Sequence, residues 1–125
     1  MTKITILDFT ENKVSFSSSL GNALATWDGS RPVLHECYDV EIDIDDFFEW
    51  GVNINYTTHE KSAIEVVDGI FKGVAKVLYY EDDGVLSVML GDTVVLLEAG
   101  SPLGIGEYVV FFTSVDHVTL YPVHI

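Results

Sequence analysis

The sequence predicts an all-β fold, and we expect a small single-domain barrel or sandwich of about 9–11 short antiparallel strands. Apolar residues make up 48% of the 125 residues, which is ample for a packed core. The 7 Phe and 6 Tyr, together with many Val and Ile, favour strands over helices. Turn signals recur about every 8 to 12 residues, the spacing of an all-β domain. Because 125 residues is also a common size for one domain, residues 1–125 are expected to form a single unit.

Short alternating runs separated by turn residues indicate the first strands. Ile4 and Ile6 begin a strand, and residues 14–17 alternate cleanly between apolar and polar. Residues 20–27 form a third, weaker strand. The Asp, Gly, Ser and Pro residues within 28–32 then favour a loop.

Residues 38–44 carry the clearest strand pattern in the chain. Apolar and acidic residues alternate there with a period of two, which places the two sets on opposite faces. The inward set is Tyr38, Val40, Ile42 and Ile44, and the outward set is Asp39, Glu41 and Asp43. Like charges on one strand face repel one another, so we expect these carboxylates to have a role other than local stability.

After this strand we expect one helical turn before strand structure resumes. Asp45 is a suitable N-cap for a turn through residues 47–50, and Gly51 would end it. Residues 52–56 then return to alternation, which predicts another strand.

Residues 61–78 fit two structures, a hairpin and an amphipathic helix. Val67-Asp68-Gly69-Ile70 is a strong two-residue hairpin signal, and the odd-numbered positions from Phe71 to Tyr79 are apolar or Gly. The helix is the alternative, because the apolar residues of this segment also fill one half of a helical wheel. Each interior Gly would cost a helix roughly 1 kcal/mol, so the hairpin is favoured. With the helix, the fold would instead be α+β.

The rest of the chain alternates between strands and glycine-containing turns. Strands are expected at residues 77–80, 85–90, 93–97, 108–112 and 115–123, with a loop at 99–106. Residues 108–112 are apolar on both faces and suit a central strand. Pro122 places the end of the last strand at a sheet edge. A long strand, a hairpin, a Gly-rich connection and a closing strand make the C-terminal half OB-like in pattern.

The charge balance limits the class of partner. The chain has 20 Asp and Glu against 6 Lys and Arg, a formal net charge of −14, and no Lys or Arg follows Lys76. Such a surface repels nucleic acid and anionic membranes and attracts basic proteins. No secretory signal or membrane-spanning segment is expected. Together with a single cysteine, Cys37, this favours a reducing, cytoplasmic location.

The sequence contains no catalytic, cofactor or metal motif, so we expect a protein that performs no chemistry. A calcium loop starting at Asp39 fails, because its sixth position is Ile44 rather than Gly and its twelfth is Trp50 rather than Glu. A Cys37 nucleophile with His35 as its base is disfavoured, because neighbouring carboxylates oppose thiolate formation. Residues 100–106 lack the Lys that a phosphate loop requires.

The densest acidic segment leads to a functional hypothesis. Seven carboxylates and no Lys or Arg lie from Glu36 to Glu49, which indicates either a solvated, solubilising strand face or a docking surface for a basic protein. Adjacent aromatic residues favour the docking surface, because aromatic anchors ringed by charge are typical of interface hot spots. The expected contact residues are Asp39, Glu41, Asp43, Asp45, Asp46, Glu49, Phe48 and Trp50.

These features predict an inhibitor or immunity-type protein that neutralises a basic toxin or nuclease by binding it. Nucleases carry cationic clefts for phosphate, which an acidic protein can occupy, and electrostatic steering accelerates such encounters. The alternative is a non-enzymatic structural subunit or homo-oligomer, in which apolar strands such as residues 108–112 pair between chains.

Overall fold

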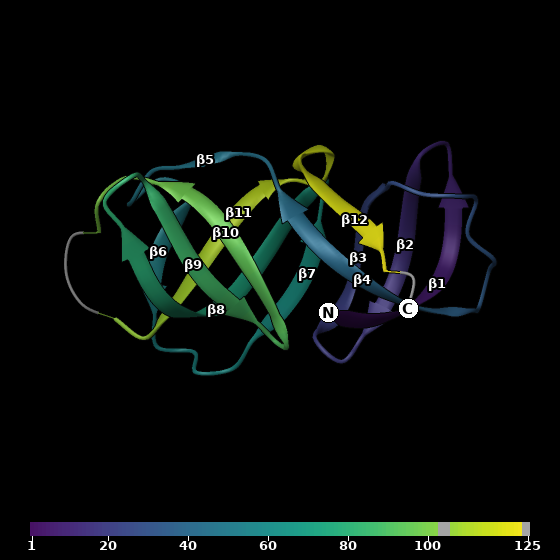
Figure 1. The fold of residues 1–125 in the computed structure, drawn as a ribbon, viewed down its shortest axis with the longest axis horizontal. Helices are drawn as coiled ribbons and strands as arrows, with labels where there is room; N and C mark the ends of the chain where they lie inside the picture. The colour runs from purple at the N-terminus through teal and green to yellow at the C-terminus, as the bar shows by residue number, and fades with distance from the viewer. Residues whose placement is uncertain (103–105, 124–125) are drawn as a thin grey trace.

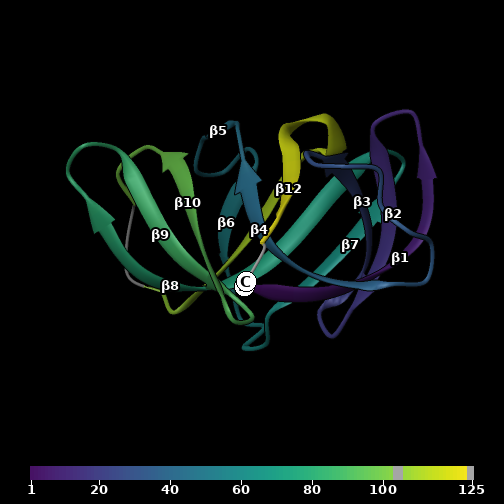
Figure 2. The same cartoon turned by 45° about the vertical axis from the view of Figure 1, so that its right-hand side comes forward.

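The fold is built almost entirely from strands. The computed structural model describes residues 1–102 and 106–123, and within these ranges it contains twelve strands, one short 3₁₀ helix and no α-helix (Figure 1). The predicted all-β class is therefore confirmed. A barrel lies at one end of the molecule and a larger curved sheet at the other, as the turned view in Figure 2 also shows.

Five strands close a barrel that contains both the first and the last strand of the chain. They pair in the order β1-β2-β3-β12-β4, and their bounds are β1 (Thr2–Thr10), β2 (Lys13–Ser18), β3 (Gly21–Trp27), β4 (Cys37–Ile44) and β12 (Val118–Pro122). β12 runs antiparallel to β4 and parallel to β3, so the last strand completes the ring. The five-stranded barrel therefore uses the N-terminal strands and the last strand, rather than the C-terminal half where the OB-like pattern placed it.

The strands between β4 and β12 form a second sheet of seven strands. Its order is β5-β10-β9-β8-β11-β6, with β7 paired to β8, and a 3₁₀ helix, η1 (Val115–His117), leads from β11 into β12. The bounds are β5 (Phe47–Phe48), β6 (Ile54–Thr57), β7 (Ala63–Val67), β8 (Ile70–Glu81), β9 (Val85–Leu90), β10 (Thr93–Ala99) and β11 (Tyr108–Ser114). β11 pairs with β8 on one side and with β6 on the other. The expectation that residues 108–112 pair between chains is therefore wrong, because both edges of that strand are occupied within this chain.

The ambiguous segment at residues 61–78 is a hairpin, not a helix. β7 and β8 pair antiparallel, and the two residues between them, Asp68 and Gly69, have φ angles of 52° and 75°. Positive φ at both central residues is what a type I′ turn requires, which explains the Asp-Gly pair. The helical turn expected after Asp45 is also absent: Phe47 and Phe48 instead pair in parallel with the end of β10.

The β2–β3 turn joins the barrel to the second sheet. The Leu20 carbonyl accepts a hydrogen bond of 2.9 Å from the Ile64 amide of β7. Gly21 makes this approach possible, because it has φ 135° and a Cβ there would collide with the Ile64 carbonyl. The hydroxyls of Thr2 and Thr93, both buried, form a second link between the two sheets.

Close packing inside the second sheet predicts that Gly73→Ala destabilises the protein. A Cβ at Gly73 would overlap the buried ring of Phe111 on the neighbouring strand β11. Overpacking of this kind costs about 1–3 kcal/mol in unfolding free energy, which urea denaturation measures directly. Gly100→Ala is the matched control, because among the described residues, its chain neighbours aside, none has an atom within 4 Å of a Cβ there, and its effect should stay within about 0.5 kcal/mol. Equal effects of the two substitutions would contradict this packing argument.

Candidate interaction surface

The outer face of β4 presents the carboxylates that the sequence assigned to it. Val40, Ile42 and Ile44 are buried, with exposed fractions of 0%, 6% and 5%. Glu41 and Asp43 point into solvent, and Asp39 is half-buried. The predicted division of this strand into a core face and an acidic face is therefore confirmed.

One cation borders this acidic face. Lys3 of β1 lies opposite Asp39 in the register of the barrel. No ion pair joins them within 4.0 Å, however: the pairs found among residues 1–102 and 106–123 are Lys13–Asp116, Lys72–Glu65 and His117–Asp46. The acidic face is therefore largely unneutralised by the protein itself.

The other cross-strand neighbours of these carboxylates are uncharged. On β12, Tyr121 lies opposite Glu41 and Thr119 lies opposite Asp43. Tyr121 is 41% exposed, so its ring stands in solvent beside the Glu41 carboxylate. Successive outward residues on a strand are only about 6.6–6.8 Å apart, and their like charges repel without a cation between them.

The acidic face continues into a shallow groove between the end of β4 and the strands β9 and β10. The groove has a volume of about 250 Å³ and is lined by Asp43, Asp45 and Asp46 on one side and by Val85, Leu96 and Glu98 on the other, with Ile44 and Leu97 below. Among the described residues, no Lys or Arg lines it. Leu96 is 59% exposed, which leaves an apolar side chain surrounded by carboxylates.

The two adjacent phenylalanines differ in position. Phe48 is fully buried, and its ring makes a T-shaped contact with Phe111 at a centroid distance of 5.6 Å. The prediction of Phe48 as a partner anchor is therefore wrong, because the side chain belongs to the core. Phe47 is 58% exposed and lies beside Glu98 in the parallel pairing of β5 with β10. Phe47 thus provides the exposed ring that was expected of its neighbour.

Trp50 and Glu49 lie at the turn that follows β5. The Trp50 indole donates a hydrogen bond of 2.8 Å to the Gly100 carbonyl, and its ring packs on Tyr56 at a centroid distance of 4.9 Å. These contacts leave Trp50 half-buried and committed to the fold. Glu49 is exposed, and its backbone N–H donates to the Asn53 side chain at 2.7 Å.

Asp46 is held by a small polar cluster and is therefore less available than its neighbours. Its Oδ2 accepts a hydrogen bond of 2.7 Å from the hydroxyl of Thr113, which is 4% exposed. His117 Nδ1 lies 3.5 Å from the same oxygen and 3.2 Å from the Thr113 hydroxyl. The Asp45 amide also donates to the His117 carbonyl at 2.9 Å. These bonds fix the end of β4 to β11 and η1.

This Asp-Thr-His cluster does not have the geometry of a nucleophilic triad. The Thr113 proton goes to the Asp46 carboxylate, and the same ring nitrogen of His117 faces both partners. In a working triad, the histidine takes the hydroxyl proton with one nitrogen and donates to the carboxylate with the other. The cluster is accordingly a structural connection, and it places an imidazole beside the acidic groove.

Sequence reasoning missed Leu96 and Tyr121 as exposed apolar members of this surface. Residues 93–97 are apolar at nearly every position, so their alternation does not reveal which side chains face solvent. Tyr121 follows a buried Leu120 in a strand whose partners come from distant parts of the chain. Only the assembled barrel shows that its ring lies beside Glu41.

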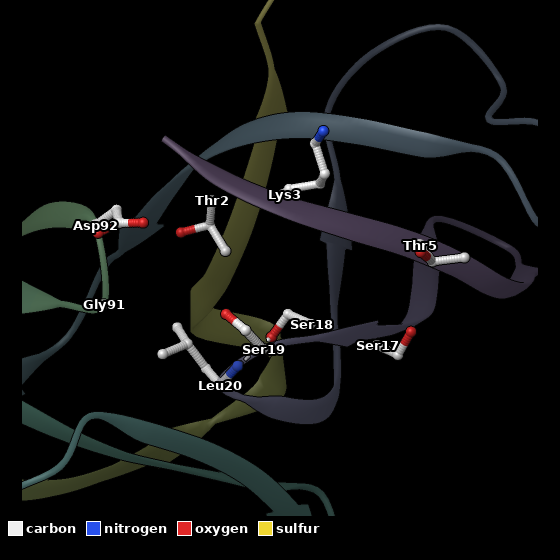
Figure 3. Close-up of a pocket in the computed structure, with 9 residues that line it drawn as sticks. All are labelled: Thr2, Lys3, Thr5, Ser17, Ser18, Ser19, Leu20, Gly91 and Asp92. Carbon is white, nitrogen blue, oxygen red and sulfur yellow. Dashed lines mark hydrogen bonds between the residues drawn. The ribbon is translucent and has the colours of Figure 1, made fainter.

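A hydroxyl-rich pocket of about 370 Å³ lies where the barrel meets the β9–β10 turn. Figure 3 shows Thr2, Ser18 and Ser19 around it, with Leu20 and Gly91 closing one side. The Lys3 side chain points away from the serine side chains in this view (Figure 3). The pocket is therefore lined by hydroxyls and by two charged residues, Lys3 and Asp92, of which Lys3 is directed away from the serines, and it is a weaker candidate than the acidic surface.

The structure does not bring together the remaining residues that were considered for a nucleophile or a metal site. Cys37 is exposed, and its Sγ lies 3.4 Å from the Thr5 hydroxyl, while His35 occupies a turn position with φ 70°. Within residues 1–102 and 106–123, no three His, Cys, Asp or Glu side chains converge as a metal would require. The expected loop at 99–106 falls partly outside the described residues.

One carboxylate outside this surface has a shifted pKa. Asp116 of η1 accepts a hydrogen bond from Lys13 of β2, with an Nζ–Oδ1 distance of 2.7 Å. This hydrogen bond, and then the Lys13 charge, lower the pKa of Asp116 from its usual 3.8. The pair connects η1, which follows the last strand of the second sheet, to the first residue of β2 in the barrel.

No family, no curated protein and no solved structure matches this chain. None of the described helical segments is long and apolar enough to cross a membrane.

The lowered pKa of Asp116 predicts a pH-dependent effect of Asp116→Asn. A carboxyl whose folded-state pKa is depressed stabilises the protein above its unfolded pKa and loses that contribution as pH falls through the folded value. Asp116→Asn should therefore reduce the unfolding free energy at pH 7, and this effect should shrink progressively as the pH falls below 3.8 and through the lowered folded-state pKa.

Asp83→Asn is the control, because it removes one exposed charge that has no ion-pair partner among the described residues. Urea unfolding at several pH values separates the two variants. If they behave alike at neutral pH, the Lys13–Asp116 pair contributes nothing.

Proposed function

We propose that this protein acts by binding a basic protein through the acidic surface formed by β4 and the adjoining groove. Glu41, Asp43 and Asp45 supply charge, and Phe47 and Leu96 supply apolar contact. The observation that carries the proposal is that Glu41 and Asp43 on β4, and Asp45 just after it, are exposed and have no ion-pair partner among the described residues. Charge arranged in this way accelerates encounter with a cationic partner and discriminates against acidic ones.

The apolar side chains within the surface favour a docking surface for a partner over a face that only keeps the protein soluble. A solubilising face needs charge alone, whereas Phe47 and Leu96 are 58% and 59% exposed beside carboxylates. Exposed apolar groups ringed by charge gain free energy only when a partner covers them. Tyr121 adds an aromatic ring at the other end of the same surface.

The partner class that best fits is a basic toxin or nuclease, which this protein would neutralise without performing chemistry. Such enzymes hold a cluster of Lys and Arg for phosphate binding, and a line of carboxylates at a strand's spacing can pair with it. We place this activity in the cytoplasm, where the exposed thiol of Cys37 stays reduced.

The test compares the proteins that are captured by three affinity columns. One carries the wild-type protein, one the variant E41Q/D43N/D45N, and one the variant E81Q/D82N/D83N, which loses the same charge at the exposed β8–β9 turn. Soluble basic proteins of the host are loaded at low salt and eluted with a salt gradient, and eluates are assayed for nuclease activity. The wild-type and turn-variant columns should retain a basic nuclease or toxin, and the E41Q/D43N/D45N column should release it.

Equal retention on all three columns would contradict the proposal, because net charge alone would then explain binding. Elution that does not depend on salt would contradict it as well, since screening weakens contacts between exposed charges.

A further inference from the structure

A second cleft, different in chemistry, lies on the outer face of β7, β8, β11 and β6. Its volume is about 380 Å³, which falls within the roughly 300–1,000 Å³ of small-molecule sites. None of its lining residues belongs to the acidic groove. The two sites therefore share no lining residue.

The floor of this cleft is apolar. Ala63, Val74 and Val110 lie side by side across β7, β8 and β11, because Val74 is paired with each of the other two. Phe112 continues the floor on β11 and is 39% exposed. A hydrocarbon or aromatic body placed here would remove apolar surface from water, at roughly 25 cal/mol for each Å² covered.

The rim of the cleft carries three basic residues and one carboxylate, Glu65. Lys61 and His59 reach it from the connection between β6 and β7, and Lys72 reaches it from β8. Lys72 Nζ lies 3.5 Å from the Glu65 carboxylate, so its charge is partly neutralised. Within residues 1–102 and 106–123, Lys61 has no carboxylate within 4.0 Å. Lys61 is therefore the lysine of the rim that has no ion-pair partner among the described residues.

The position of Lys61 follows from the topology. β6 pairs with β11 and β7 pairs with β8, so residues 58–62 must pass from one side of the β8–β11 pair to the other. The Ser62 hydroxyl donates to the Met89 carbonyl at 3.4 Å and ties down the end of this connection. Lys61 is therefore held at the border of the apolar floor.

We propose that this cleft binds a small apolar monocarboxylate. The hydrocarbon body lies on Val74, Val110 and Phe112, and the carboxylate pairs with Lys61, with Lys72 and His59 alongside. One free cation matches a single negative charge, whereas a polyanion would require several. At physiological salt, charges farther than about 8 Å are largely screened, so the three basic residues and Glu65 determine the local potential more than the distant carboxylates do.

A second copy of this chain is a poor occupant. Each copy has a net charge of −14, so two copies repel one another as they approach. The single uncommitted lysine cannot offset that repulsion. A small monoanion carries a single negative charge, so the protein repels it far less than it repels a second copy of the chain.

The experiment titrates the full-length protein with three probes that share one hydrocarbon chain. Decanoate and decyltrimethylammonium are added below their micelle concentrations and decanol below its solubility limit, and binding is followed by calorimetry and by amide chemical shifts. Decanoate should bind, with the largest shifts at Val74, Val110 and Phe112. Decanol and the cationic probe should bind at least about tenfold more weakly, because neither pairs with Lys61.

Two variants, each of which removes one positive charge, test whether decanoate binds at this cleft. Lys61→Gln should weaken decanoate binding by about tenfold, and Lys3→Gln, on the barrel, should leave it within about twofold. Four results would each overturn the proposal: no decanoate binding, equal binding of all three probes, shifts centred elsewhere, or equal losses in the two variants. Both lysines are exposed, so neither variant is expected to unfold the protein.

Discussion

The alternation of apolar and acidic residues along β4 constrains both the fold and the surface of this protein. Val40, Ile42 and Ile44 are buried in the barrel, and β1 and β12 pair with the two edges of the strand. A slip of one residue would bring Glu41 and Asp43 into the core, where unpaired charge is strongly destabilising. The register that buries the apolar residues therefore also holds the carboxylates in water along one line.

This arrangement keeps the carboxylates of the acidic surface apart from the lysines of the cleft, one of which, Lys72, pairs with Glu65. Carboxylates line β4 and the groove beside β10, while Lys61 and Lys72 border the cleft on the outer face of the second sheet. Paired charges would cancel one another's fields, whereas separated ones give each face its own potential. The acidic surface and the basic residues of the cleft therefore lie at separate places on the molecule.

Local patterns in the sequence predicted the parts of the fold that depend on local chemistry. The Asp68-Gly69 turn and the alternation of β4 involve residues close together in the chain, and both were predicted. Closure of the barrel could not be predicted, because β12 pairs with strands from the other end of the chain. Nor could the sequence tell Phe47 from Phe48, since adjacent strand residues point to opposite faces and both are apolar.

The outer carboxylates of β4 repel one another with little compensation from the protein, and the stability of E41Q/D43N tests this repulsion most directly. Urea unfolding at low salt should show this variant to be about 0.5–1 kcal/mol more stable than wild type, and E81Q/D83N should gain less. The gain should disappear at high salt, where the charges are screened. A variant that is less stable than wild type, or a gain that does not change with salt, would contradict the account.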